Sequence, residues 1–180
     1  MLHDSIKQIN NPEDSILGAV HNLYMKSFPE TERRPWEGII ELLSQPNPFF
    51  NLYVSVNEDG VLQGFISTWR LPDSLYIEHF AIEVNLRSQG IGGAMLDYVK
   101  QKAGEKPVVV EVELPEDNPD APRRIKFYEH HGFMAMKDFV YFQPPYAKGL
   151  PDVRLMLMTS KKLPDLQIFV ITLHNLVYNQ

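Results

Sequence analysis

A glycine-rich segment at residues 87–93 is the part of the sequence best suited to bind an anion. It reads Arg87, Ser88, Gln89, Gly90, Ile91, Gly92 and Gly93. The segment joins an expected strand to an amphipathic helix, and the first turn of a helix has unpaired N–H groups at the positive end of the helix dipole. Glycine lets the backbone approach a ligand with no Cβ in the way, and Arg87 adds a positive charge. We therefore expect a diphosphate at this joint.

The same glycines could instead only shape a tight turn from a strand into a helix. A Walker-type phosphate loop is excluded, because no Gly-Lys-Ser/Thr follows. A dinucleotide-binding fingerprint fits poorly, since it needs a third glycine and an acid after a second strand of a parallel sheet. The segment alone therefore leaves a binding turn and a purely structural turn open.

Glu78 lies on the strand that precedes this turn. Side chains alternate between the two faces along a strand, so Tyr76, Glu78 and Phe80 are expected to share one face. His79 is expected to point to the other face and to be structural. A solvated glutamate on a sheet is the plainer interpretation of Glu78, beside a role in proton transfer.

Strands dominate the middle of the chain, and one strand–helix–strand unit lies among them, which indicates a mixed α/β sheet. The periodicity of apolar residues and the turn signals predict helices at 11–27, 35–43, 91–103 and 123–131, and strands at 51–56, 61–71, 75–84, 108–114, 139–141 and 153–158.

The apolar tail at residues 161–180 is ambiguous. Pro164 suits the first turn of a helix, whereas the apolar run at 169–172 favours a strand. We expect a helix there, so that residues 1–160 form a single domain with 161–180 as a C-terminal extension. If its apolar side is exposed, that extension would be the contact of a homodimer.

Composition excludes several classes of function. The chain has 180 residues, 44% of them hydrophobic, and a net charge of −6, with no basic stripe for nucleic acid. It has no cysteine, which excludes disulfides, thiolate metal sites and a cysteine nucleophile. The six histidines lack metal-ligand spacing, and His130 and His131 are adjacent and cannot converge on one ion, so we expect no metal.

The sequence shows no signal for export or for a membrane. Residues 1–4 do not begin a signal peptide. No stretch approaches the roughly 20 apolar residues that a membrane span needs. We expect a soluble cytoplasmic protein.

Two motifs in the stretch 75–133 resemble the GNAT superfamily of N-acetyltransferases. Residues 87–92 match the family's Arg/Gln-x-x-Gly-x-Gly/Ala signature, and residues 127–133 resemble its aromatic-Tyr-Glu-x-x-Gly-Phe run. The resemblance implies a mixed, mostly antiparallel twisted sheet of six to seven strands flanked by about four helices. It also implies an acetyltransferase domain that uses acetyl-coenzyme A (acetyl-CoA) as co-substrate and no metal.

The resemblance also assigns residues to the co-substrate. The backbone of Phe80, Ala81 and Ile82 would pair with the pantetheine arm, as an added strand would. The main-chain N–H groups of residues 87–93 would hold the pyrophosphate.

Tyr128 matches the family's tyrosine, which protonates the leaving thiolate; the alternative is a core tyrosine with a capped hydroxyl. The attacking amine is protonated at neutral pH, since its pKa is about 10.4, so a base is needed. By the resemblance Glu78, three residues before Ala81, is the first candidate. Glu111 and Glu113 share a face of the next strand, and either could bind the amine or relay its proton. Glu113 ranks behind Glu78.

The chain departs from the family after this strand. The family's asparagine, seven residues before the tyrosine, would fall at Ala121, whereas Asn118 lies ten before it, in a lengthened loop. The asparagine's role therefore cannot be carried over to Asn118. Arg123 and Arg124 could meet a cofactor phosphate, or simply form a solvated or ion-paired helix start.

The resemblance places the acceptor under a lid made of residues 24–36 and 142–148. Aromatic side chains in both segments, with Glu30 and Glu32 in the first, suit an organic cation. We expect direct acetyl transfer to a primary amine of a small molecule or peptide. The alternative is a non-catalytic acyl-CoA-binding module of the same fold.

Overall fold

The computed structural model describes residues 5–45 and 47–179. Residues 1–4, in which we expected no signal peptide, lie outside this part. The described part contains eight strands: β1 (Ile6–Ile9), β2 (Phe50–Val56), β3 (Leu62–Arg70), β4 (Leu75–Ile82), β5 (Val108–Glu113), β6 (Met134–Ala135), β7 (Tyr141–Gln143) and β8 (Val153–Thr159). Its helices are α1 (Leu17–Ser27), η2 (Glu30–Glu32), α2 (Trp36–Ser44), η3 (Val84–Leu86), α3 (Ile91–Ala103), α4 (Ala121–His130), α5 (Leu166–Leu173) and η4 (His174–Tyr178).

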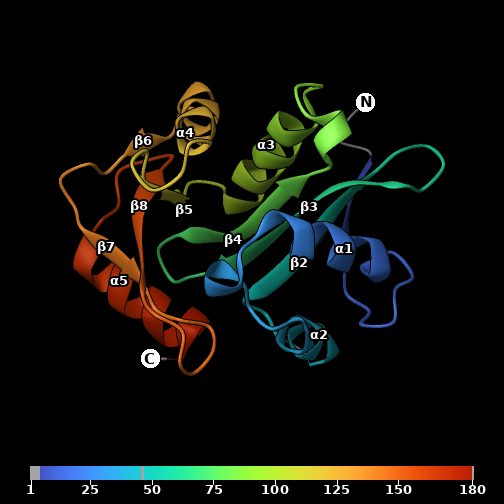
Figure 1. The fold of residues 1–180 in the computed structure, drawn as a ribbon, viewed down its shortest axis with the longest axis horizontal. Helices are drawn as coiled ribbons and strands as arrows, with labels where there is room; N and C mark the ends of the chain where they lie inside the picture. The colour runs from blue at the N-terminus through green and yellow to red at the C-terminus, as the bar shows by residue number, and fades with distance from the viewer. Residues whose placement is uncertain (1–4, 46, 180) are drawn as a thin grey trace.

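All eight strands belong to one sheet, in the order β1-β2-β3-β4-β5-β8-β6, with β7 also paired to β8 (Figure 1). Neighbouring strands are antiparallel except β4 and β5, which are parallel and connected through α3. A parallel pair needs such a crossover, because the chain must return to the same end of the sheet. The predicted mixed, mostly antiparallel sheet is confirmed, with eight strands where six to seven were expected.

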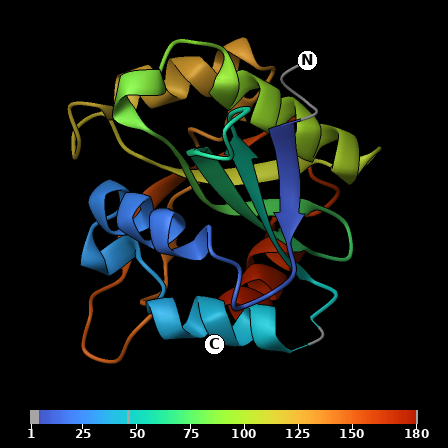
Figure 2. The same ribbon diagram turned by 90° about the vertical axis from the view of Figure 1, so that its right-hand side faces the viewer.

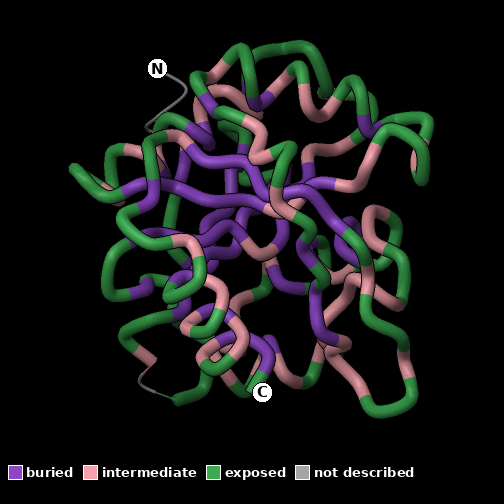
Figure 3. The backbone as a smooth tube through the Cα atoms, turned by 90° about the vertical axis from the view of Figure 1, so that its left-hand side faces the viewer, coloured by how far each residue is buried: buried purple, intermediate pink, exposed green. Residues whose placement is uncertain are grey.

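Helices cover both faces of the sheet (Figure 2). The face under α3 and α4, here called the α3 face, carries one apolar cluster with Met95, Leu96 and Val99 at its centre. The opposite face, under α1, α2 and α5, is called the α1 face, and its cluster includes Tyr24 and Leu173. The strands between these layers are buried along most of their length, and the exposed residues lie in the loops and on the outer sides of the helices (Figure 3).

A β-bulge interrupts β4 at Glu78. In the register with β3, Ser67 lies opposite His79 and Thr68 opposite Ile77, so Glu78 is the extra residue. A bulge bends its strand and re-aims the side chains around it. The two faces of β4 are therefore not what simple alternation predicts.

The bulge coincides with the place where β4 separates from β5. The parallel pairing runs from Leu75 and Val108 to Ile77 and Val110 and ends there. Beyond it β5 keeps its pairing with β8 to Glu113, while β4 keeps only β3 as a neighbour. Residues 78–82 of β4 thus present an edge that no described strand pairs, and such an edge can accept a further extended chain.

Two features near the N-terminus differ from the prediction. The first helix begins at Leu17 rather than near Asn11, because Asn11 and Asp14 accept backbone hydrogen bonds from Glu13 and Ile16 and hold two turns. Strand β1 was not predicted. It is an edge strand of four residues with only its first and last residues buried, so it lacks the alternation that identifies a strand.

The C-terminal segment packs onto the α1 face. Helix α5 begins at Leu166 with Asp165 as its cap, whose carboxylate accepts the N–H of Ile168 at 3.0 Å. Residues 174–178 continue as the π-helix η4. The buried side chains of this segment join the core of the sheet: Leu163, Phe169, Leu173, Val177 and Tyr178.

Candidate functional site

The glycine-rich turn ends directly at the first residue of α3. Gly90 caps the helix in the left-handed conformation at φ 83°, which glycine adopts without steric penalty. Ser88 is also left-handed, at φ 65°. A non-glycine residue in this region is uncommon and marks a constrained turn. The four unpaired N–H groups of the first turn of α3 begin at this exposed corner.

Gly93 allows α3 and α4 to approach each other here. A Cβ at Gly93 would lie 2.7 Å from Cε1 of His131, too close for an ordinary contact. The ring of His131 packs on Phe127 at a centroid distance of 4.8 Å. The turn thus lies where the start of α3 packs against α4 and against Ile82 of β4.

The predicted pantetheine-binding residues are at the unpaired edge of β4. Ala81 is 8% exposed and faces the α1 face, while Phe80 and Ile82 pack on the α3 face. The ring of Phe80 lies 6.1 Å from that of Phe127 on α4. The turn and the free edge are therefore continuous, which is the geometry needed by a ligand with an anionic end and an extended arm.

Tyr128 lies on α4, and its side chain belongs to the apolar cluster of the α3 face. It is 7% exposed, and its ring packs against those of Phe127 and Phe133. No residue of the described ranges 5–45 and 47–179 forms a hydrogen bond with its hydroxyl. Burial raises the pKa of Tyr128 above its usual value, although the positive charge of Arg124 lowers it. The hydroxyl is therefore protonated and available to donate.

Glu113 forms an ion pair beside this tyrosine. Its Oε1 accepts a hydrogen bond from Nη2 of Arg124 at 2.6 Å and from Nδ2 of Asn118 at 3.1 Å. Arg124 is thus an ion-paired residue in the first turns of α4. The carboxylate of Glu113 is thus held in place by a cation and an amide.

Glu32, in η2, is a second acid near this pair. Burial raises the pKa of Glu32 to about 7, and the negative charge of Glu113 raises it further, opposed by Arg124. Its backbone oxygen lies 3.1 Å from Nε2 of His79. Sequence reasoning placed Glu32 in the lid as one of the acids that suit an organic cation, but nothing in its local pattern marks an acid with a raised pKa.

Glu78 is enclosed on the α1 face, and its side chain has no exposed surface. Arg34 donates to its Oε1 from Nε at 2.9 Å and from Nη2 at 2.7 Å, and Nε1 of Trp69 donates to Oε2 at 2.9 Å. Burial alone would raise the pKa of Glu78, but the charge of Arg34, with His79 and Trp69, holds it well below the usual value. These contacts favour a structural ion pair over the base predicted from the sequence.

The predicted alternation around Glu78 is wrong because of the bulge. Glu78 and His79 both point to the α1 face, where His79 lies 3.2 Å from the hydroxyl of Tyr24. Phe80, expected beside Glu78, points to the α3 face. His79 is 1% exposed and also meets Oγ of Ser67 at 3.4 Å, so its environment is that of a core histidine.

Glu111 lies in a cage of tyrosines on the same α1 face. Its two oxygens accept hydrogen bonds from Tyr141 at 2.5 Å, Tyr76 at 2.7 Å and Tyr178 at 3.0 Å. Burial raises the pKa of Glu111 to about 7, although the three hydroxyls, Tyr141 first, lower it; the charge of Glu78 raises it further. Tyr178 lies in the C-terminal segment, and the sequence of that segment did not predict a contact with Glu111 on β5.

The two predicted lid segments meet over this face. The ring of Tyr146, from the β7–β8 loop, lies 5.1 Å from the guanidinium carbon of Arg34 and 4.9 Å from the ring of Tyr178. Arg34 also donates to the backbone oxygen of Val177 at 2.6 Å. The N-terminal lid, the β7–β8 loop and η4 are therefore held together at Arg34, which the sequence did not single out.

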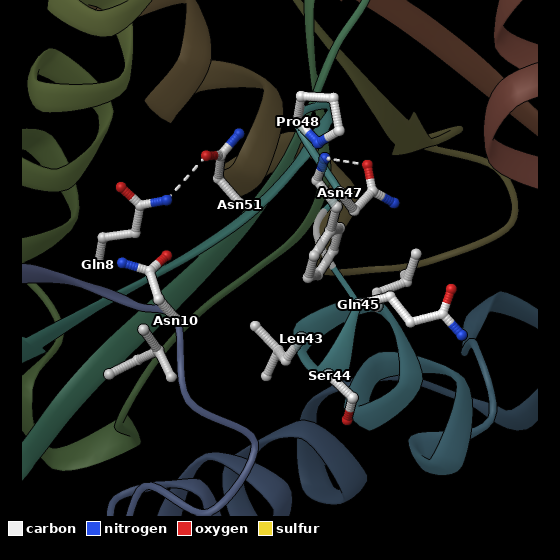
Figure 4. Close-up of a pocket in the computed structure, with 11 residues that line it drawn as sticks. Gln8, Asn10, Leu43, Ser44, Gln45, Asn47, Pro48 and Asn51 are labelled. Carbon is white, nitrogen blue, oxygen red and sulfur yellow. Dashed lines mark hydrogen bonds between the residues drawn. The ribbon is translucent and has the colours of Figure 1, made fainter.

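A surface depression of about 450 Å³ lies at the other end of the strands, between β1, the start of β2 and the end of α2 (Figure 4). Its rim carries amide side chains such as Gln8, Asn10 and Asn51, with Gln8 donating to Asn51 at 2.9 Å. It shares no residue with the site at the β4 edge, and its lining contains no titratable side chain.

Within residues 5–45 and 47–179, no three His, Asp or Glu side chains are grouped so as to hold a metal ion. Over the same residues, no helix is both long and apolar enough to cross a membrane. The structure places Tyr128 near Glu113 and, through Phe127, beside the edge of β4, and it places Glu78 and Glu111 on the α1 face.

Comparison with known proteins identifies this arrangement. The sequence profile described as the acetyltransferase (GNAT) family matches residues 17–133. YjbC of Bacillus subtilis (strain 168), assigned as an acetyltransferase, is 29% identical over 68 residues, which are 37% of this chain and 34% of that protein. This chain's match thus spans about a third of the length of that curated relative.

Solved structures share the whole fold. A protein from Bacteroides thetaiotaomicron assigned to the GNAT acetyltransferases is 31% identical, with a TM-score of 0.84 over 97% of this chain and 98% of that one. An aminoglycoside 6'-N-acetyltransferase complexed with coenzyme A has a TM-score of 0.62 at 16% identity, over 89% of this chain and 99% of that one. The second likeness concerns the fold alone.

Proposed function

Because the chain belongs to the GNAT acetyltransferase family, we propose that it transfers the acetyl group of acetyl-CoA directly to a primary amine of a small molecule or peptide. The observation that carries this proposal is the unpaired edge of β4, which is followed along the chain by the glycine turn before α3. Phe80 on this edge packs against Phe127, the neighbour of Tyr128 on α4. The turn would bind the pyrophosphate, the edge the pantetheine arm, and the hydroxyl of Tyr128 would face the thioester.

We assign the binding of acetyl-CoA to backbone groups. Phe80, Ala81 and Ile82 would pair with the pantetheine arm, as an added strand pairs with a sheet edge. The N–H groups of residues 87–93 would hold the pyrophosphate, with the charge of Arg87 nearby. The coenzyme A bound to a protein of the same fold supports this assignment.

The proposed chemistry needs no covalent enzyme intermediate. The amine nitrogen forms a bond to the thioester carbon, the carbon–sulfur bond breaks, and Tyr128 donates its proton to the sulfur. Glu113 and Arg124 form a neutral pair that fixes the electrostatic surroundings of that hydroxyl. Glu78, bound to Arg34, holds the N-terminal lid against β4.

Carboxylates and aromatic rings around the lid suit a cationic amine. We propose a cytoplasmic enzyme that forms a homodimer through α5, whose Ile168 and Ile171 are 58% and 62% exposed.

Titration calorimetry with acetyl-CoA, coenzyme A and NADH tests the binding step. Binding of the two coenzyme A ligands alone is expected, and no binding would overturn the proposal. Thiol release is then followed with a diamine, an aminoglycoside and a short peptide as acceptors. Tyr128→Phe keeps the ring and is expected to lower kcat about 100-fold with unchanged acetyl-CoA affinity. A fully active Tyr128→Phe protein would refute the acid. Binding without turnover of any acceptor would favour the non-catalytic acyl-CoA-binding module.

A further inference from the structure

We propose that Glu111 is the general base that accepts the proton of the incoming amine. The inference rests on the proposed acetyl transfer and concerns the one step that the family resemblance leaves open here. Glu78 and Glu113, ranked first and second from the sequence for this step, are each paired with an arginine. Glu111, which the sequence also allowed to bind the amine or relay its proton, receives its hydrogen bonds from phenol hydroxyls.

The position of Glu111 follows from the register. Val110 is the last residue of β5 paired with β4, so Glu111 is the first residue beyond the point at which the strands separate. Its side chain points to the α1 face, as that of Glu78 does across the gap. A thioester at the inner end of an arm paired with residues 80–82 would reach this point. An amine approaching from the lid side would therefore have Glu111 beside it.

The surroundings of Glu111 suit a group that takes and releases a proton. It is half-buried, and no described cation forms an ion pair with it. Burial sets the pKa of its carboxyl at about 7, where a base is both ionised and able to bind a proton. A carboxylate with a guanidinium partner, such as Glu78, has lost that ability because its charged form is stabilised.

A chain of hydroxyls connects the lid with this carboxylate. The hydroxyl of Tyr146 lies 3.4 Å from that of Tyr178, and Tyr178 donates to Glu111 at 3.0 Å. Tyr76, Tyr141 and Tyr178 are positioning residues that orient the carboxylate. The other titratable or charged groups near the cage, by element, are Glu78 on β4, Glu113 on β5, Tyr146 in the β7–β8 loop, His174 on η4 and Arg34 in the N-terminal lid.

The proton balance is complete with the groups present. One N–H bond of the ammonium breaks and an O–H bond forms on Glu111. The free amine attacks the thioester carbon and the carbon–sulfur bond breaks. The sulfur takes the proton of Tyr128, and Tyr128 regains a proton from the nitrogen of the new amide. Glu111 then releases its proton to solvent.

The test is the pH dependence of kcat/KM, which reports the base of the free enzyme. The acceptor is the amine of the panel above that is turned over fastest. The wild-type rate should rise with pH and level off above about pH 7. Glu111→Gln should be about 100-fold slower at pH 7. Its rate should keep rising about tenfold per pH unit as free amine accumulates.

Two further variants keep the test decisive. Tyr141→Phe keeps the carboxylate but removes one donor that lowers its pKa, so the rise should move upward by roughly one pH unit. A merely structural cage would change stability without moving the profile. Glu32→Gln removes the other acid with a pKa of about 7. If the rise near pH 7 persists in Glu111→Gln, or disappears only in Glu32→Gln, the assignment of Glu111 is overturned.

The two proposals fail in different ways. A wild-type protein that does not bind acetyl-CoA refutes the proposed function. A wild-type protein that binds it and releases thiol, together with a Glu111→Gln profile that matches the wild type, refutes only the base. Calorimetry of Glu111→Gln with coenzyme A shows whether the variant is folded, and wild-type affinity is expected.

Discussion

Replacing Arg34 by methionine should destabilise the protein more than any other single change at the lid. The side chain of Glu78 has no exposed surface, and Arg34 is its only guanidinium partner among the described residues. Removing one partner of a buried ion pair leaves an unpaired charge and costs about 3–5 kcal/mol. For a chain of this size, 1 kcal/mol corresponds to about 2–4 °C in Tm. We therefore expect Tm to fall by roughly 10 °C at pH 7.

The pH dependence of the stability difference between wild type and Arg34→Met shows whether the unpaired charge of Glu78 causes it. The fold lowers the pKa of Glu78, so the stability that the pair contributes is present above the unfolded pKa of about 4.3 and is lost as the pH falls through the folded value. Without Arg34, burial raises the pKa of Glu78, and the folded variant takes up a proton in mild acid. The gap in stability between wild type and Arg34→Met should therefore be largest at pH 7 and shrink toward about pH 4.5.

Denaturant unfolding at the two pH values measures this gap. Arg34→Met combined with Glu78→Gln should be more stable than Arg34→Met alone, because no buried charge remains. Arg33→Met is the matched control, since the one hydrogen bond that its side chain forms with a described residue, to the backbone oxygen of Phe28, is long at 3.4 Å. A loss below about 1 kcal/mol, or a gap that does not change with pH, would refute the reasoning.

Two shorter predictions concern the β4 edge and the assembly. Gly64→Ala would place a Cβ 2.7 Å from the backbone oxygen of Ala81, so it should shift β4, cost about 1–3 kcal/mol and weaken coenzyme A binding in calorimetry. Gly18 lies on helix α1, and a Cβ there would have no atom within 4 Å. Gly18→Ala should therefore stabilise the protein by about 0.5–1 kcal/mol. Equal changes in stability for the two variants would contradict the role of the close contact at Gly64. Ile168→Glu with Ile171→Glu should convert the proposed dimer to a monomer in sedimentation analysis, and a wild-type monomer would end that proposal.

The sequence predicted the elements whose signal is local. The helix at 91–103 and the strands around it carry regular apolar spacing and clear turn residues, and the structure confirms them. The glycine turn and Tyr128 were recognisable because short motifs mark them. Strand β1 was missed because its buried residues do not alternate.

The arrangement of charged groups could not be predicted in the same way. The bulge at Glu78 comes from the register between β3 and β4, which no local pattern contains. Because of the bulge, the side chains of Glu78 and His79 point to the same face. The ion-pair partner of Glu78 is Arg34, which lies 44 residues earlier in the chain. The cage of Glu111 needs residues 76, 141 and 178 together, and only the folded chain shows that they meet.

The contacts of η4 have a consequence for the order in which the protein is completed during synthesis. All eight described strands are made before residue 160, but Arg34 and Glu111 obtain contacts from Val177 and Tyr178. A chain still on the ribosome can therefore form its sheet and its glycine turn while this side of the lid is unfinished. The ability to bind a coenzyme A ligand and the ability to turn over an amine would then arise at different moments of translation.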